Sequence, residues 1–146
     1  MSKETKINKI LLPIDGSEAS FKTAKYATAL ASQINASVII LHVIAIPDFP
    51  RHLKSVDVYY EEIKKEAENW FDMIADFWQN KNLKIKTKIV TGAFSVVESI
   101  VEVADKENAD IIVIGSRGRS QFKKLLLGSV TNGVVTHAKC PVLVVK

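Results

Sequence analysis

Short, mainly apolar runs recur along this chain and constrain its fold more than any other feature. They occupy residues 10–12, 38–44, 111–114 and 142–145. Runs of this length are typical of strands that are buried on both faces, as in the centre of a parallel sheet. A parallel sheet needs helical crossovers between its strands, so the pattern predicts an α/β protein.

The segments between these runs carry apolar residues at helical spacing. Ser17, or Asp15, is the predicted N-cap of the first helix, and Asn35 is its predicted end. Ser95 begins a capping-box pattern that opens the third helix. The other two helices are expected over residues 59–77 and 130–138.

One further strand shows a different pattern, because polar and apolar residues alternate along it. Leu83, Ile85, Thr87 and Ile89 alternate with Lys84, Lys86 and Lys88. This period predicts a strand with one face in water. A row of lysines is typical of a sheet edge that resists pairing with other chains. We therefore interpret these lysines as edge protection rather than as a nucleic-acid patch.

Strands and helices alternate from the first strand, residues 7–14, to the fifth, Val142–Val145. Right-handed crossovers then give a doubly wound five-stranded parallel sheet with helices on both faces, which is a Rossmann-like α/β fold. The second strand and the fourth, residues 109–114, must be central, and the third must be an edge. The order 3-2-1-4-5 satisfies these conditions. The 146 residues are expected to form one domain.

The chemically most informative segment follows the fourth strand. It contains Gly115, Gly118 and Gly128 and leads into the last helix at Ser129. A strand, a glycine-rich loop and a helix N-terminus often form an anion site, because free N–H groups and the helix dipole point to one place. Gly115 and Gly118 can adopt positive φ and have no Cβ, so a phosphate could come close to the backbone. Ser129 can cap the helix. Positive charge comes from Arg117, Arg119, Lys123 and Lys124.

The spacing of this segment, G-x2-G-x9-G-S, differs from the Walker A and G-x-G-x-x-G patterns. It resembles the nucleotide loop of the ATP-binding branch of the universal stress protein family. Residues 11–17 and 140–145 resemble the same family, so the similarity spans nearly the whole chain. The resemblance implies the strand order 3-2-1-4-5, a single universal stress protein domain over residues 1–146, and ATP as the ligand. The basic loop leaves AMP or cyclic AMP open as alternatives.

In a doubly wound sheet, ligands bind where the strand order reverses, which is here between the first and fourth strands. By resemblance, Asp15 lies near the ribose and phosphates and is a tentative ligand of Mg²⁺ or Mn²⁺. Val43 meets the adenine through its backbone. The expected nucleotide-binding residues are Pro13, Ile14, Asp15, Val43, Gly115, Ser116, Arg117, Gly118, Gly128, Ser129, Val130 and Thr131.

The properties of the whole chain favour a soluble cytoplasmic protein. Its one cysteine, Cys140, fits a reducing compartment, and we interpret it as a small buried hydrophobe. We find no apolar signal core and no run near the ~18 residues of a membrane span. The mild net charge of +4 does not favour nucleic acid. The uncharged fifth strand, Val142–Val145, predicts a homodimer, because a bare apolar edge invites pairing.

The resemblance implies a nucleotide-dependent stress-response or regulatory module that hydrolyses ATP slowly at most. One alternative is a slow ATPase or phosphotransferase in which a metal at Asp15 activates the γ-phosphate, although no residue is placed as a general base. Another is a nucleotide-free dimeric interaction module, which the intact glycine motif disfavours. Trp70 and Phe77 lie on the apolar face of the long helix, and we interpret them as core.

Overall fold

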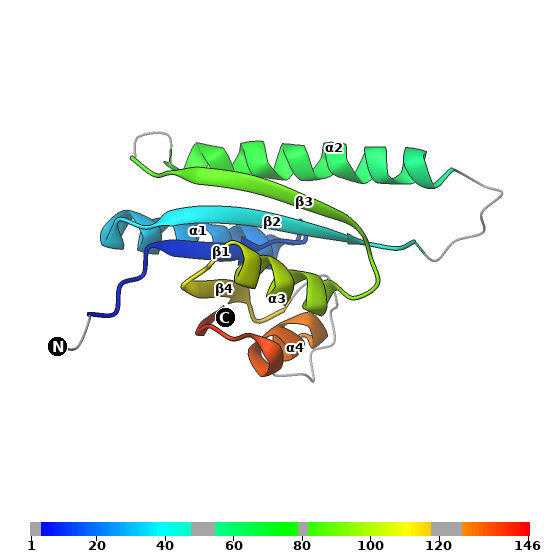
Figure 1. The fold of residues 1–146 in the computed structure, drawn as a ribbon. Helices are drawn as coiled ribbons and strands as arrows, with labels where there is room; N and C mark the ends of the chain where they lie inside the picture. Colours follow the sequence, from blue (N-terminus) through cyan, green and yellow to red (C-terminus); the bar gives the residue numbers. More distant parts are fainter. Residues whose placement is uncertain (1–3, 48–54, 79–81, 118–126) are drawn as a thin grey trace.

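Five parallel strands in the order β3-β2-β1-β4-β5 form one sheet in the computed structural model, as the sequence predicts (Figure 1). The structure describes residues 4–47, 55–78, 82–117 and 127–146. β1 lies at the centre, since it pairs with β2 on one side and with β4 on the other. The strands are β1 Lys9–Pro13, β2 Ser37–Ala45, β3 Ile85–Ala93, β4 Ile111–Gly115 and β5 Val142–Val145.

Helices cover both faces of this sheet, so the fold is doubly wound (Figure 1). The helices are α1 Glu18–Ile34, α2 Val56–Ala75, α3 Val96–Lys106 and α4 Ser129–His137, and the short 3₁₀ helix η1, Asp76–Trp78, follows α2. α1 and α2 pack on one face, and α3 and α4 pack on the other. Among the described residues, no helix combines the length and apolar composition that crossing a membrane requires.

Alternate residues of the central strands face opposite helical layers. In β1, Ile10 and Leu12 belong to the apolar cluster under α1 and α2, whereas Leu11 belongs to the cluster under α3 and α4. All three side chains are fully buried. Both faces of β1 are therefore packed, which explains why polar residues do not alternate along it.

Capping residues fix the ends of α1 and α3 where the sequence predicts them. The Ser17 hydroxyl accepts a hydrogen bond from the Ser20 N–H at 3.1 Å, and Asn35 ends α1 in the left-handed conformation at φ 58°. The Ser95 hydroxyl accepts one from the Glu98 N–H at 3.1 Å. These side chains satisfy groups that a helix end leaves open.

The predicted cap of α4 is wrong by one residue. Gly128 is the N-cap, at φ −65° and ψ 160°, and Ser129 is the first helical residue. A serine inside the first turn does not occupy the position from which a hydroxyl reaches the N–H groups one turn ahead. Gly128 has no side chain, so no capping side chain bonds the N–H groups at the N-terminus of α4.

Three strands begin later than their patterns predict, and one of them is β3, which begins at Ile85 rather than at Leu83. β1 begins at Lys9 rather than at residue 7, and β4 begins at Ile111 rather than at residue 109. The reason is Asp110, whose carboxylate accepts the N–H groups of Asn8 at 2.8 Å and Lys9 at 3.0 Å. This side chain takes the backbone donors that a longer pairing of β1 and β4 would use.

The two edges of the sheet differ in their chemistry. On β3, Lys86 and Lys88 reach Glu107 at the end of α3, with N–O distances of 3.2 and 3.5 Å. The hydrogen bond from Lys86 is the main reason that the pKa of Glu107 lies below its usual value. On β5, Leu143 exposes 41% of its surface. The edge of β3 is therefore charged and that of β5 is apolar, as the sequence predicts.

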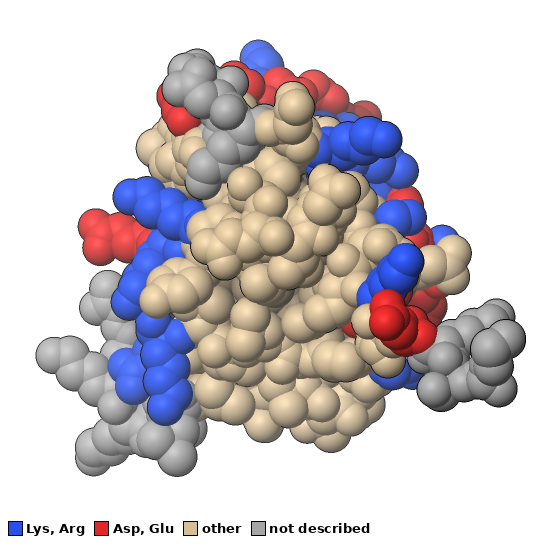
Figure 2. Space-filling view, turned by 90° about the vertical axis from the view of Figure 1, so that its left-hand side faces the viewer, with Lys and Arg blue, Asp and Glu red and all other residues tan. Residues whose placement is uncertain are grey.

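Figure 2 shows the end of the molecule at which the strands begin. Uncharged side chains cover the middle of this face, and charged side chains lie around its rim. An anionic ligand gains most from concentrated positive charge and helix N-termini. The N-termini of α1, α3 and α4 lie at the opposite end of the sheet, where the strands that precede these helices finish.

Candidate functional site

A pocket of about 300 Å³ lies at the carboxyl ends of β1 and β4. The chain leaves β1 toward the α1 face and leaves β4 toward the α4 face, so this is the point at which the winding reverses. Ten of the predicted residues line the pocket: Pro13, Ile14, Asp15, Val43, Gly115, Arg117, Gly128, Ser129, Val130 and Thr131. Ser116 is not part of the lining, and Gly118, Arg119, Lys123 and Lys124 lie outside the described residues.

The wall of the pocket at β2 and α3 is apolar. It includes Leu41, Val96, Ile100 and Ile114, which the sequence analysis did not assign to the site. Leu41 is fully buried and Ile100 exposes only 2% of its surface, so their pattern predicts ordinary core positions. Leu41 and Ile114 lie toward the carboxyl ends of β2 and β4, and Val96 and Ile100 of α3 face these ends. This position distinguishes them from the other core residues.

The opposite wall is polar and is built by β4 and the N-terminus of α4. The Thr131 hydroxyl donates a hydrogen bond of 2.6 Å to the Gly115 carbonyl, and the Gly128 N–H donates one of 2.7 Å to the Ser116 carbonyl. These bonds hold the first turn of α4 against the end of β4. Its positive dipole end therefore faces the pocket.

Ser116 shapes this wall without lining it. Its N–H donates to the Val145 carbonyl at 2.8 Å, which continues the pairing of β4 with β5 beyond the match of Gly115 with Val145. Ser116 thus connects the glycine-rich segment to the edge strand through its backbone.

Gly115 does not adopt the positive φ that the sequence analysis allowed it, and its lack of a Cβ has a packing reason. Among the described residues, glycine adopts positive φ at Gly16 and Gly92, and Gly115 does not. A Cβ at Gly115 would instead lie 2.9 Å from the Thr23 hydroxyl oxygen on α1. That distance is shorter than a normal contact, so the close approach of α1 to β4 excludes a side chain here.

Asp15 sits on a turn that α2 holds in place. Its carboxylate accepts the Ser17 N–H at 3.0 Å, and Gly16 follows at φ 80°. The ring of Trp70 occupies the space that a Cβ at Gly16 would need. Trp70 was expected only as core, and it does pack against the core cluster, but it also shapes the turn that carries Asp15.

His42 completes this arrangement. Its Nδ1 lies 2.8 Å from the Ile14 carbonyl oxygen, and its ring meets that of Trp70 edge to face with centroids 4.9 Å apart. His42 also lines the pocket. The carboxyl end of β1 is therefore braced from β2 and α2 at once.

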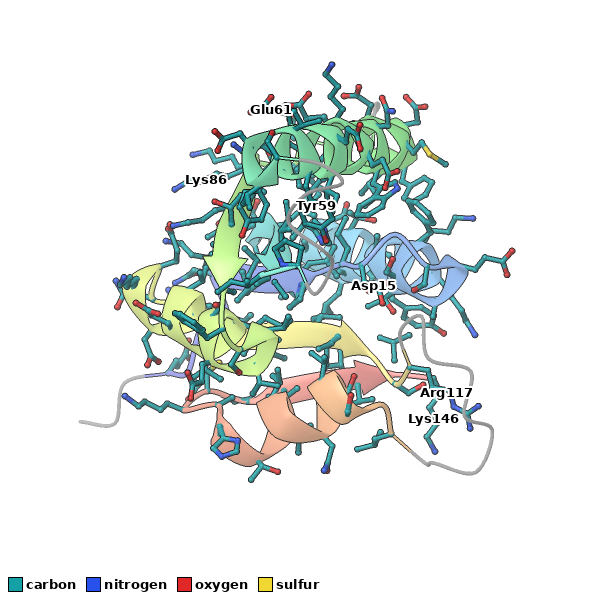
Figure 3. All side chains as sticks on the ribbon, turned by 90° about the vertical axis from the view of Figure 1, so that its right-hand side faces the viewer. Asp15, Tyr59, Glu61, Lys86, Arg117 and Lys146 are labelled. Carbon is teal, nitrogen blue, oxygen red and sulfur yellow. The ribbon has the colours of Figure 1, made fainter. Side chains whose placement is uncertain are left out.

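Figure 3 looks onto the ends of the strands, with Asp15 near the centre and Arg117 below it. These two are the charged residues among the described lining. No group of three or more His, Cys, Asp or Glu side chains that could hold a metal ion occurs in the part of the chain that the structure describes. Asp15 alone would have to share a metal ion with oxygen ligands from elsewhere.

Cys140 supplies no nucleophile to this site. Its side chain packs against the cluster under α3 and α4 but is only partly buried, so the expectation of a small buried hydrophobe is met in part. Burial raises the pKa of its thiol, and the carboxylates of Asp105 and Asp110 raise it further. The thiol therefore stays protonated at neutral pH, and a protonated thiol is a poor nucleophile.

The sheet order makes the chain a doubly wound α/β protein, and its pocket lies at the switch point, where ligands usually bind in such folds. The model of the universal stress protein family matches residues 6–146, and the chain belongs to this family. Universal stress protein MJ0531 of Methanocaldococcus jannaschii is 34% identical over 146 residues, which cover 98% of this chain and 84% of the relative.

Two solved structures show how similar the folds are. The structure of MJ0577, a universal stress protein of the same organism, has a TM-score of 0.78 and 38% identity, and the match covers 97% of both chains. A universal stress protein in complex with cAMP has a TM-score of 0.73 and 27% identity, and the match covers 97% of this chain and 99% of the other.

Proposed function

We propose that this protein is a regulatory module that binds ATP in the pocket between β1 and β4. One observation carries the proposal: the pocket joins an apolar wall to a polar wall at a helix N-terminus. A purine ring favours the first environment and phosphates favour the second. A similar universal stress protein is known in complex with cAMP, another adenine nucleotide.

The nucleotide would lie with its base toward β2 and its phosphates toward α4. The adenine would contact Leu41 and Ile100 and would meet the backbone of Val43. Asp15 would lie beside the ribose and phosphates. The remaining proposed contacts with ribose and phosphates come from Gly115, Ser116, Arg117, Gly118, Gly128, Ser129, Val130 and Thr131.

A divalent cation fits this arrangement as a companion of the phosphates. Mg²⁺ is usually bound through one or two carboxylates together with substrate phosphates and water. Asp15 supplies one carboxylate at the polar side of the pocket. We propose Asp15 as the protein ligand of Mg²⁺ or Mn²⁺, with the other ligands coming from the nucleotide and water.

The module would act in the cytoplasm by changing conformation or partners when ATP binds, as part of a stress response. Slow hydrolysis at most is proposed, because the sequence shows no residue that resembles a committed general base for fast phosphoryl transfer. Binding without such contacts to the transition state does not accelerate chemistry. In the enzyme alternative, a metal-dependent ATPase, a metal ion held by Asp15 would activate the γ-phosphate and so raise the turnover rate.

The test combines binding and turnover in one preparation. We expect calorimetry to show saturable binding of one ATP per chain in the presence of Mg²⁺, with GTP binding more weakly. We expect phosphate release far below the ~10 s⁻¹ median of enzymes. No ATP binding would contradict the proposal. A rate near that median, lost on Asp15→Asn, would instead establish the enzyme alternative.

We also propose a homodimer through β5. This edge strand is apolar and partly exposed, with Leu143 41% accessible. The β3 edge carries Lys86 and Lys88 and resists pairing. Two copies that meet antiparallel about a two-fold axis would extend the sheet and cover both apolar edges.

Sedimentation at micromolar concentration checks the dimer. We expect a single species at twice the chain mass. Leu143→Lys should shift it toward the monomer, because a lysine on an edge strand opposes its pairing with another strand. Thr87→Lys on β3 is the matched control, since it adds the same charge to the other edge and should leave the dimer intact. A wild-type protein that sediments as a monomer would contradict the proposal.

A further inference from the structure

We propose that Arg117 and Lys146 make this pocket select adenine nucleotides that carry a polyphosphate chain over those with a single phosphate. This inference rests on the proposed function and specifies the ligand class of the same site. It assigns a role to Lys146, which the sequence analysis did not include in the site.

The register of the sheet brings the two cations to one edge. β4 and β5 run parallel with Gly115 opposite Val145, and the Ser116 N–H extends the pairing to the Val145 carbonyl at 2.8 Å. Lys146 follows directly after β5, and Arg117 lies two residues after the end of β4. Adjacent strands lie only about 4.8 Å apart, so both side chains start from the same corner of the molecule.

That corner adjoins the polar wall of the pocket. Arg117 lines the pocket together with Gly128 and Ser129 at the start of α4. Both Arg117 and Lys146 are exposed, and Figure 3 shows them on the same side of Asp15. The phosphate attached to the ribose would bind at the N-terminus of α4. Arg117 and Lys146 would lie beside that phosphate.

The charges decide which ligands gain from this arrangement. A single phosphate is already neutralised in part by the helix dipole at α4. Each further phosphate brings additional negative charge, and Arg117 and Lys146 supply the matching positive charge. Hydrogen bonds between charged groups are roughly twice as strong as neutral ones. The gain applies to ATP, whereas AMP and cyclic AMP have no phosphate that extends to this corner.

The experiment measures affinities for ATP, AMP and cyclic AMP by calorimetry in wild type and in Lys146→Ala. We expect wild type to bind ATP at least about tenfold more tightly than AMP. Lys146→Ala should weaken ATP about tenfold and leave AMP and cyclic AMP within about twofold. Lys146→Arg should retain the preference, and Arg117→Gln should reduce it.

Lys139→Ala is the matched control. Lys139 precedes β5 and pairs with Asp105 at 3.2 Å, so its removal changes the net charge equally at the other end of the same strand. It should leave the ratio of ATP to AMP affinity unchanged. Raising the salt concentration should shrink that ratio in wild type, because exposed charges are screened.

Equal affinities of wild type for ATP and AMP would overturn this inference and leave the proposed function intact. An equal loss for all three nucleotides in Lys146→Ala would also overturn it, since that result indicates a structural role. An unchanged affinity for ATP in Lys146→Ala would do the same. Failure of wild type to bind any of the three would overturn the proposed function, and this inference with it.

Discussion

Replacing Gly16 with valine is expected to destabilise the fold by about 2–5 kcal/mol and to abolish nucleotide binding. Gly16 adopts φ 80°, which costs an ordinary L-residue about 1–2 kcal/mol and a β-branched residue more. A side chain there would also collide with the ring of Trp70. The turn would have to move, and Asp15 would move with it.

Gly92→Val provides the matched control for this prediction. Gly92 also has positive φ, at 71°, but a Cβ there would meet only the Tyr60 hydroxyl at an ordinary distance of 3.6 Å. Urea unfolding of both variants separates backbone strain from the collision. We expect Gly16→Val to lose clearly more stability than Gly92→Val. In the double variant with Trp70→Ala, the loss of stability should be smaller than the sum of the losses from Gly16→Val and Trp70→Ala alone. Equal losses in the two glycine variants would contradict this account.

Gly128→Val is expected to weaken ATP binding about 100-fold without unfolding the protein. Gly128 lines the pocket as the N-cap of α4. Its φ of −65° and ψ of 160° are allowed to valine, so the backbone is not strained. The added side chain would stand beside the N–H groups that the phosphates are proposed to use. Two lost hydrogen bonds to a charged group account for a loss of this size.

Two comparisons check the Gly128 prediction. Gly128→Ala should give an intermediate loss, because its side chain is smaller. Thr136→Val lies on the exposed side of the same helix and should bind ATP as wild type does. Thermal unfolding without nucleotide should be similar for all four proteins. Equal ATP affinity in wild type and Gly128→Val would contradict the proposal that the phosphates bind at the N-terminus of α4.

The fold was predictable because its determinants are local or follow a period. The apolar runs of β1, β2 and β4 predict strands buried on both faces, and the alternation along β3 predicts an edge. α1 begins after Ser17 and stops at Asn35, as the side chains of these two residues predict. Errors arose at the boundaries of elements: the Asp110 carboxylate shortens β1 and β4, and the N-cap of α4 is Gly128 rather than Ser129.

Most residues that line the candidate site could be predicted from motifs, whereas the contacts that shape it could not. Pro13 to Asp15 and the glycine segment supply the residues that a motif can show. Trp70 lies 54 residues beyond Gly16 in sequence, and its contact with that turn depends on how α2 packs. Gly115 needs the absence of a Cβ because of Thr23 on α1. Such requirements arise from packing between distant elements, which a single sequence does not encode in any local pattern.

The most direct test of the account is a crystal structure of the protein grown with ATP and Mg²⁺. We expect one nucleotide per chain, with its adenine against Leu41, Val43 and Ile100 and its phosphates at the N-terminus of α4 beside Gly128 and Ser129. Asp15 should face the cation. A nucleotide bound elsewhere on the surface, or this pocket empty at saturating ATP, would contradict the central claim.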